Sequence, residues 1–256
     1  MATKVYSIRA LSNMHVGSGD NNYGVIDKLV QRDVVTNLPT IHSSSLKGAL
    51  CEFFKNKYGK ESDKVKNIFG GEKSKGGYDF FEADLVSIPV RSNKAQYFNA
   101  FSPHFLKQVF EKINALGFKY DLGNLPVPQK GKPICLNDKF EGAIVEEQEW
   151  KCVKLPQGQI VDSIKLKFLG DNIVFMHADD FKSVCEKLPV IARNCLENGQ
   201  STNLWYEEVL PRESRFLTVV RTNGLLETEF DSILNEIVQI GANATIGYGY
   251  CKFSTL

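Results

Sequence analysis

The sequence predicts an α+β fold, because strand-like and helix-like patterns alternate along the chain. Residues 4–10 alternate between apolar and polar side chains, with Tyr6 and Ile8 on one face, which indicates a first strand. Residues 43–57 carry a single apolar stripe from Leu46 to Phe54, at the spacing of a helix. The predicted order of strand, helix, strands, helix, hairpin, helix and strand fits a ferredoxin-like (RRM-like) sheet with long insertions.

The other elements follow from the same patterns. Residues 55–77 hold seven Lys against two Glu and one Asp, with two Gly-Gly pairs, which is typical of a mobile basic loop. Several prolines make residues 121–136 irregular. We further expect an extended stretch at 25–30, a helix at 104–116, a strand at 163–168, a helical stretch from Asp179 that restarts at Pro189 and ends before Gly199, a hairpin at 204–221, a helix at 227–240 and a strand at 248–253.

The composition is that of a globular protein, and we expect one domain over residues 1–256. Hydrophobic residues make up 43% of the 256 residues and charged residues 24%. Lys and Arg number 31 and Asp and Glu 30, so a net charge of +1 argues against a wholly basic nucleic-acid binder but not against a local basic groove. We see no signal peptide, no membrane span and no CxxC pair among the six cysteines, which predicts a cytoplasmic protein with reduced thiols and no membrane partner.

The first chemical candidate is Asp27, in the polar stretch from Asp20 to Arg32. A carboxylate beside cations such as Lys28 can bind a metal ion or orient a nucleophile. The alternative is a surface carboxylate in an ordinary salt bridge.

The second candidate is the run from Ser43 to Gly48. The hydroxyls of Ser44 and Ser45, the free N–H groups of a helix start and the charge of Lys47 together suit a phosphodiester. The alternative is simple helix capping by the serines. The spacing of an ATP-binding P-loop is absent.

Glycines and aromatic residues supply the remaining candidates. Glycine-rich segments around Gly17 and Gly19, and around Gly247 and Gly249, either let a ligand approach the backbone or simply form turns. His15 is a possible acid or base, or a structural histidine. Trp205, close in sequence to two arginines, either stacks on single-stranded bases or packs within a hairpin. From the residues alone, the result is an α+β protein with several plausible phosphate contacts.

Five blocks of the sequence together resemble the backbone subunits of type III-B CRISPR effectors (the Cmr complex), which belong to the RAMP superfamily of RNA-binding proteins. They occur in family order and span nearly the whole chain: His15-Val-Gly-Ser-Gly19, then Ile26-Asp-Lys-Leu-Val-Gln-Arg-Asp33 with Thr36–Leu50, Ile88-Pro-Val-Arg-Ser92, Leu204-Trp-Tyr-Glu-Glu-Val-Leu-Pro211 and Ile240–Gly249. The chain departs from the family at Cys51-Glu52, Ala242 and Tyr248, which bears on the strength of guide binding at those points.

The resemblance implies an RRM-like palm with inserted finger loops and a protruding β-hairpin thumb, which chain order places near residues 200–222. Copies stack head to tail along a CRISPR guide RNA, beside other subunits of the effector, and each cuts the paired single-stranded target RNA. Asp27 would be the catalytic carboxylate and would bind Mg²⁺ or Mn²⁺. His15, Glu207 and Glu208 are expected helpers. The expected RNA-binding residues are Gly17, Gly19, Ser44, Ser45, Lys47, Arg91, Trp205, Gly247 and Gly249.

Three alternatives stay open at this point. The first is a guide-binding scaffold that does not cut, and the second is a stand-alone, metal-independent RAMP endoribonuclease that processes CRISPR precursor RNA. The third is a small-molecule enzyme of α+β class.

Overall fold

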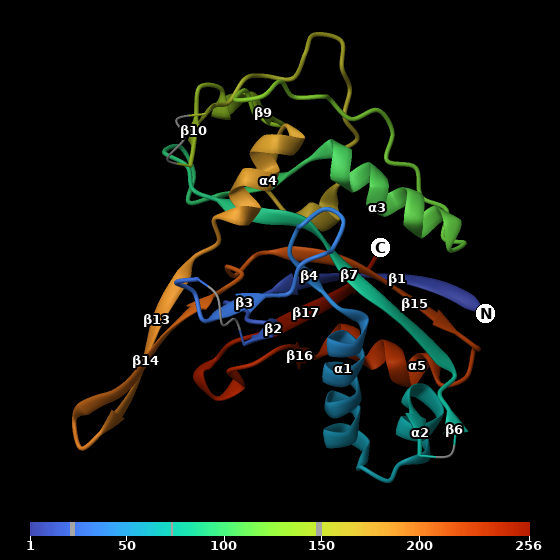
Figure 1. The fold of residues 1–256 in the computed structure, drawn as a ribbon. Helices are drawn as coiled ribbons and strands as arrows, with labels where there is room; N and C mark the ends of the chain where they lie inside the picture. The colour runs from blue at the N-terminus through green and yellow to red at the C-terminus, as the bar shows by residue number, and fades with distance from the viewer. Residues whose placement is uncertain (21–23, 73, 147–149) are drawn as a thin grey trace.

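The protein is an α+β molecule built on one large mixed sheet (Figure 1), in a computed structural model that describes residues 1–20, 24–72, 74–146 and 150–256. All neighbours in the sheet are antiparallel except β8 and β12, which are parallel. Its path runs through β16 (Ile237–Gln239), β17 (Tyr250–Thr255), β1 (Ala2–Ala10), β15 (Arg215–Thr222), β7 (Tyr78–Val90), β8 (Phe98–Phe101), β12 (Ile173–Phe175) and β9 (Ile134–Cys135), with β4 (Thr40–Ile41) paired to β7. The α+β prediction is confirmed.

Four long strands, in the order β17-β1-β15-β7, form the centre of the sheet. The chain passes through α1 (Ser43–Tyr58) between β1 and β7, and through α5 (Glu227–Phe230) and the 3-10 turn η3 (Asp231–Asn235) between β15 and β17. The two faces of β1 are buried in different cores, because strand side chains alternate. Tyr6 and Ile8 belong to the core beneath α1, whereas Val5 belongs to the core beneath α3.

Aromatic rings fill the core beneath α1. Phe54 of α1 stacks on Phe230 with ring centroids 5.7 Å apart, and Phe69 stacks on Phe80 at 5.3 Å. Phe69 ends a second helix, α2 (Asp63–Phe69), whose N-cap Ser62 accepts a hydrogen bond from the Lys64 N–H. The expectation of a loop over residues 55–77 is therefore wrong at α2, because Val65, Ile68 and Phe69 give this short basic segment a buried face.

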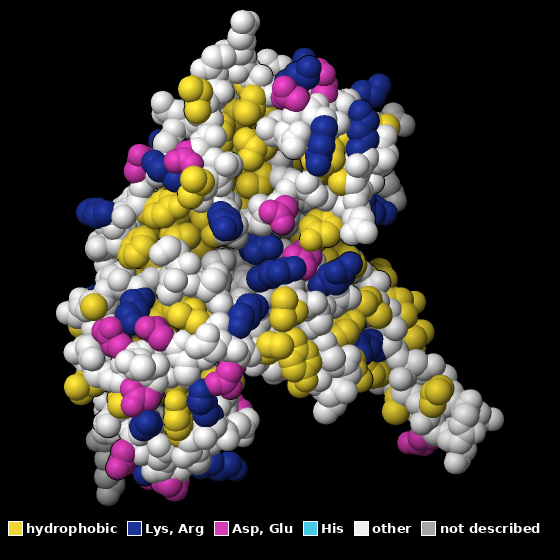
Figure 2. All heavy atoms as spheres, turned by 180° about the vertical axis from the view of Figure 1, so that it is seen from behind, with side chains coloured by type: hydrophobic (Ala, Val, Ile, Leu, Met, Phe, Trp, Pro, Cys, Tyr) yellow, Lys and Arg dark blue, Asp and Glu magenta, His cyan; other side chains and the backbone are white. Residues whose placement is uncertain are grey.

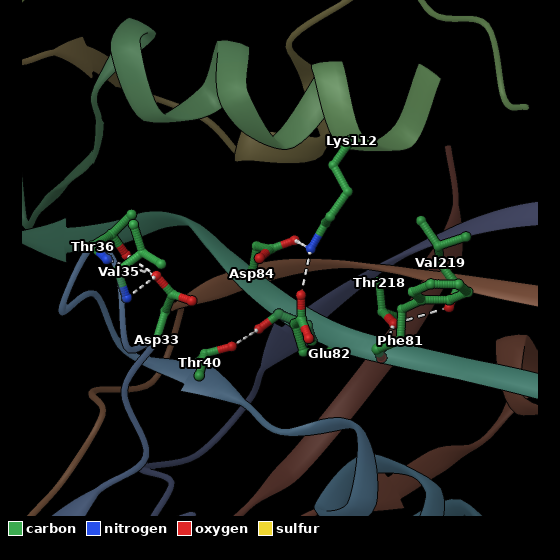
Figure 3. A network of polar contacts seen from close by, with 11 residues as sticks. Asp33, Val35, Thr36, Thr40, Phe81, Glu82, Asp84, Lys112, Thr218 and Val219 are labelled. Carbon is green, nitrogen blue, oxygen red and sulfur yellow. Dashed lines mark hydrogen bonds and ion pairs between the residues drawn. The ribbon is translucent and has the colours of Figure 1, made fainter. Parts of the chain in front are cut away.

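Helix α3 (Pro103–Ala115) covers the opposite face of the sheet and confirms the helix predicted at 104–116. Its Lys112 reaches down to β7, where Nζ lies 2.5 Å from Asp84 Oδ2 and 2.9 Å from Glu82 Oε1 (Figure 3). Burial raises the pKa of the Asp84 carboxyl despite this lysine. The same view shows Asp33, whose carboxylate accepts hydrogen bonds from the Val35 and Thr36 N–H groups.

A long hairpin projects from the body of the molecule (Figure 1). It consists of β13 (Val190–Glu197) and β14 (Gln200–Glu208), joined by Asn198 and Gly199, both with positive φ. This hairpin belongs to a separate sheet of order β13-β14-β3-β2, with β3 (Lys28–Val30) and β2 (Gly17–Asp20) at its base. A hairpin at 200–222 is therefore wrong: β14 pairs backwards with β13, and β15 lies in the main sheet between β1 and β7.

Other expectations fail where tertiary contacts override local pattern. Residues 163–168 form a turn instead of a strand, and Ile164 is 81% exposed although alternation placed it inside. Helix α4 (Ala178–Glu186) is present, but the predicted restart after Pro189 is the strand β13. The helix expected at 227–240 is divided among α5, η3 and β16, and the strand expected at 25–30 begins only at Lys28.

The remaining elements are short. They are the hairpin β5 (Gly70–Gly71) and β6 (Ser74–Lys75), the ladder β10 (Ile144–Val145) and β11 (Trp150–Lys151), and the 3-10 turns η1 (Asp138–Phe140), η2 (Lys167–Leu169) and η4 (Ala244–Ile246). Among the described residues, no helix has the length and apolar character needed to cross a membrane.

Candidate functional site

The base of the projecting hairpin brings Asp27 against β14. The Tyr206 N–H donates to Asp27 Oδ2 at 2.7 Å, and the Asp27 N–H donates back to the Tyr206 carbonyl at 3.1 Å. The ammonium of the next residue, Lys28, lies 5.4 Å from the centroid of the Trp205 ring. Asp27 itself is exposed, so a carboxylate is held by the main chain at an open edge of the hairpin.

The next residue along β14, Glu207, points into the protein and is only 2% exposed. Arg193 Nε of β13 lies 2.7 Å from one of its oxygens, and Asn243 Nδ2 donates to the other at 2.6 Å. His15 Nδ1 lies 3.4 Å from the same oxygen as Asn243 and donates to the Glu208 carbonyl at 2.7 Å. The carboxylate of Glu207 is thus surrounded by partners from three distant segments.

Glu208 is buried in the same way, at 3% exposure, but on the other side of β14. Arg32 Nη2 donates to one carboxylate oxygen at 2.7 Å, and the Val30 N–H donates to the other at 3.0 Å. A second donor of Arg32 reaches the Cys185 carbonyl at 3.0 Å. This arginine therefore joins β3, β14 and the end of α4.

Burial argues against the catalytic contacts expected of His15, Glu207 and Glu208. A group that touches a scissile phosphate must reach the solvent-filled edge, and all three side chains are at most 4% exposed. Their hydrogen bonds instead fix the hairpin to the body of the molecule. His15, Glu207 and Glu208 are thus buried and hydrogen-bonded, whereas Asp27 is exposed.

Gln31 fastens the start of α1 to β2. Its Nε2 donates to the Gly17 carbonyl at 3.1 Å and to Ser45 Oγ at 2.9 Å, while its Oε1 accepts from the His42 N–H at 2.8 Å. The expected serine caps are not formed: His42 is the N-cap residue of α1, and no side chain caps this helix. The Ser45 hydroxyl instead accepts a hydrogen bond from Gln31 Nε2.

The other residues expected at the start of α1 lie around this link. Ser44 is exposed and Lys47 is half-buried. Because Gln31 holds the first turn of α1 beside β2, the segment that contains Ser44, Ser45 and Lys47 lies next to Gly17.

The glycine loop 241–249 packs against residues 13–16, which directly precede β2. A Cβ on Gly241 would lie 2.3 Å from the His15 carbonyl oxygen, so only glycine allows the Ala242 N–H to donate there at 2.8 Å. Gly247 has a φ of +86° and no atom within 4 Å of a Cβ placed on it. Gly19, with a φ of +105°, is similarly open. The two glycine segments thus meet beside the hairpin base.

Arg91 lies outside this set. It follows β7 and lines a cavity of about 670 Å³ with Trp150, Lys187 and Arg212. Its Nη2 lies 2.9 Å from Glu146 Oε2. Lys and Arg side chains also gather near the middle of the face drawn in Figure 2.

The aromatic candidate Trp205 is half-buried, whereas its neighbour Tyr206 is 39% exposed. Sequence reasoning missed Arg193 and Asn243, which complete the shell of Glu207. No local pattern marks either residue, because each meets Glu207 only through the fold. Arg32 was visible only as a cation in the block that contains Asp27.

The exposed carboxylate of Asp27 could supply one ligand to a divalent metal. No group of three or more His, Cys, Asp or Glu side chains that could hold an ion occurs within the described part of the chain. Mg²⁺ is commonly bound by one or two carboxylates with substrate phosphates and water completing its shell. An exposed Asp27 fits that mode of binding and does not fit a metal cage made by the protein alone.

The sequence pattern of the RAMP superfamily matches residues 7–252. This chain belongs to the RAMP superfamily. It is 26% identical to the CRISPR system Cmr endoribonuclease Cmr4 of Pyrococcus furiosus, over 98% of this chain and 95% of that protein. It is 23% identical to the CRISPR system CMR subunit Cmr4 of Saccharolobus solfataricus, over 99% of this chain and 96% of that one.

The RAMP fold of this chain also matches solved structures over its whole length. A cryo-EM structure of type III-B Cmr-beta bound to cognate target RNA contains a chain with a TM-score of 0.79 and 22% identity, covering 100% of this chain and 97% of that chain. Oligomeric Cmr4 from Pyrococcus furiosus gives a TM-score of 0.75 and 21% identity, with 100% and 98% covered.

Proposed function

We propose that this RAMP protein is the backbone subunit of a type III-B CRISPR effector, which stacks along a guide RNA and cleaves the paired target RNA at regular intervals. The observation that carries the proposal is Asp27, an exposed carboxylate fixed by main-chain bonds at the root of a projecting hairpin. Full-length similarity to a protein named a Cmr endoribonuclease supports the same activity. Copies of this chain and other effector subunits are its protein partners, in the cytoplasm, where six free thiols stay reduced.

The fold supports separate roles for the sheet and the hairpin. The antiparallel order β17-β1-β15-β7, with helices after β1 and β15, supports the proposal of a ferredoxin-like palm. The hairpin 190–208 is the thumb of this proposal. It would separate base pairs of the guide–target duplex, so that one target nucleotide is displaced beside Asp27.

The guide RNA would run past the start of α1 and the two glycine segments. Lys47 supplies a charge, and the hydroxyls of Ser44 and Ser45 lie in the same turn of α1. Gly19 and Gly247, whose Cβ positions are open, allow a close approach of the RNA backbone. Gly17 and Gly249, whose Cβ positions are filled by His15 and Ile240, are expected RNA contacts through their main chain. Contacts to phosphate carry no sequence information, which suits a subunit that accepts any guide. Arg91 and Trp205 are further expected contacts.

The chemistry needs little from the protein, because RNA carries its own nucleophile. A displaced nucleotide can place its 2′-OH in line with the adjacent phosphorus, and positioning of this kind accounts for much of the rate. The new O2′–P bond forms as the P–O5′ bond breaks, which leaves a 2′,3′-cyclic phosphate and a 5′-OH. Asp27 would orient the hydroxyl or hold the divalent ion, Mg²⁺ or Mn²⁺. That ion would supply positive charge for the phosphate oxygens when bound.

The test is cleavage by the reconstituted effector with Asp27→Asn. We expect the rate of target cleavage to fall about 100-fold or more, as for loss of a catalytic acid or base, with guide and target binding unchanged. Asp138→Asn, an exposed change of the same chemistry in η1, is the matched control and keeps the wild-type rate. A variant that still cuts at a tenth of the wild-type rate overturns the assignment of Asp27.

The metal is tested in the same assay by chelation. Removal of divalent ions with EDTA should stop cleavage, and Mg²⁺ or Mn²⁺ should restore it. Cleavage that continues in EDTA favours the metal-independent alternative.

A further inference from the structure

A second cavity, of about 650 Å³, lies on the far side of the sheet from α1, between α3 and the loop 120–128. It runs along one face of α3, from Pro103 to Asn114, and reaches the start of α4 at Ala178. Its volume is within the range of small-molecule sites, about 300–1,000 Å³. None of the residues proposed above for guide binding or cleavage lines it.

One end of this cavity is rich in hydrogen-bond donors. The N-termini of α3, with 13 residues, and α4, with 9 residues, both open there. The first N–H groups of a helix have no partner within the helix, and the helix dipole adds positive charge at that end. Pro103, the first residue of α3, has no N–H, and His177 already accepts the Asp179 N–H in α4. The remaining free N–H groups and the two helix dipoles favour an anion at this end.

Ser102 gives a second, independent indication of a ligand. This N-cap residue of α3 lines the cavity and is 2% exposed, yet its Oγ has no hydrogen-bond partner within the described part of the chain. It does not cap its own helix. A buried hydroxyl without a partner is costly, and an anionic oxygen at the helix ends would accept its hydrogen.

Two further side chains supply donors at the same end. Lys107, one turn into α3, is exposed and lines the cavity. His177, the N-cap residue of α4, accepts the Asp179 N–H at Nδ1, which leaves the hydrogen of the neutral ring on Nε2.

The two acids in the first turn of α4 lie close to this end of the cavity, where Asp179 Oδ2 is 3.9 Å from His177 Nδ1, and each also has a partner outside the cavity. Asp179 pairs with Lys130 at 3.0 Å, and Asp180 accepts from the Gly131 N–H at 2.7 Å. Glu111 also lines the cavity, but it lies eight residues beyond Pro103, about 12 Å along the axis of α3. The fourth acid, Asp121, pairs with Lys165 at 3.0 Å.

The other end of the cavity combines aromatic and aliphatic side chains with the polar side chains of Glu111, Asn114 and Asp121. Phe110 and Tyr120 contact each other with ring centroids 5.0 Å apart, and Leu122, Leu125 and Met176 complete the wall. A ligand that uses the whole cavity therefore combines an anionic group with a flat apolar body.

We propose that this cavity binds a phosphomonoester of mononucleotide size, with the phosphate at the ends of α3 and α4 and the base against Phe110 and Tyr120. Lys107 and Ser102 contact the phosphate. The site is independent of Asp27 and of the guide-binding segments.

The experiment titrates the purified full chain with adenosine 5′-monophosphate, adenosine and inorganic phosphate by calorimetry. The monophosphate should bind at least tenfold more tightly than either part alone, because only it fills both ends. Lys107→Glu should weaken its binding at least tenfold, and Ser102→Ala about tenfold, as for loss of a hydrogen bond to a charged group. Lys182→Glu, the same charge change on α4 away from the cavity, is the matched control and should change affinity less than twofold.

Three results overturn the site. They are no binding of the monophosphate at millimolar concentration, equal affinity for adenosine, and equal weakening by Lys107→Glu and Lys182→Glu. Ser102→Ala removes an unpartnered hydroxyl and should leave the melting temperature unchanged, so it tests the phosphate contact without unfolding the chain. If a 5′-phosphorylated hexaribonucleotide displaces the monophosphate and its 5′-hydroxyl form does not, the phosphate belongs to an RNA end.

Discussion

Asp27 and Glu207 are both carboxylates at the root of the projecting hairpin, but their surroundings differ completely. Asp27 is exposed and bound through the main chain of Tyr206, whereas Glu207 is buried against Arg193, Asn243 and His15. Asp27 is open to solvent, whereas Glu207 is closed off by its partners. Residue type and proximity to β14 therefore do not distinguish the two carboxylates, whereas their exposure to solvent does.

The largest effect on stability should come from Glu207→Leu. This change leaves the buried guanidinium of Arg193 without its ion pair, which we expect to lower the free energy of unfolding by about 3 kcal/mol. Urea denaturation measures it. The double variant Arg193→Met with Glu207→Leu replaces the pair by apolar side chains and should recover most of the loss. A loss below about 1 kcal/mol for the single variant would mean that Glu207 is not a structural carboxylate.

Glu208→Gln should have a smaller effect. The amide oxygen still accepts from the Val30 N–H, but the charge that pairs with Arg32 is lost. We expect the free energy of unfolding to fall by about 1.5 kcal/mol, as for one hydrogen bond between charged groups. Glu236→Gln, which removes the exposed partner of Lys57, is the matched control and should cost no more than about 0.5 kcal/mol. Equal losses in the two variants would contradict the assignment.

The effect of Asp33 on stability should lie between those of Glu208 and Asp27, and it depends on pH. Hydrogen bonds from the backbone and hydroxyl of Thr36 and from the backbone of Val35 hold the pKa of this carboxyl below 3.8 despite partial burial. A lowered pKa gives stability that is present above pH 3.8 and is lost as the pH falls through the folded-state pKa. Asp33→Ala should therefore lower the free energy of unfolding by about 1 kcal/mol at neutral pH, and the difference should shrink in acid. Thermal melts from pH 7 to about pH 2 measure it, and a difference independent of pH would exclude the ionised form as the cause.

The smallest effect on stability should come from Asp27→Asn. The side-chain carbonyl still accepts from the Tyr206 N–H, and exposed substitutions usually change stability by less than about 0.5 kcal/mol. The contrast with Glu207→Leu, measured by the same urea titration, separates the two carboxylates. A loss above about 2 kcal/mol would place Asp27 among the structural groups.

The sequence predicted the elements whose apolar pattern agrees with their tertiary contacts. The strand at residues 4–10 and the helices at 43–57 and 104–116 are close to β1, α1 and α3. The projecting hairpin was predicted one strand too late in the chain, because aromatic and β-branched residues in β15 look like a hairpin partner of β14. The better signal was Asn198-Gly199, a two-residue turn that favours positive φ and joins β13 to β14.

The site was predictable only in part. The position of Asp27 in a family block identified the exposed carboxylate, and its role stays a prediction. Glu207 is buried against Arg193 and Asn243, and Glu208 against Arg32, and these partners come together only in the folded chain. Pattern along the sequence does not report such distances.

The projecting hairpin affects the solubility of the chain before assembly. β13 is an edge strand of its sheet, and two leucines of the hairpin, Leu196 of β13 and Leu204 of β14, are 62% and 55% exposed. Edge strands with exposed apolar side chains readily pair with strands of other molecules. A free chain with this hairpin uncovered is therefore prone to aggregate through its exposed sheet edge.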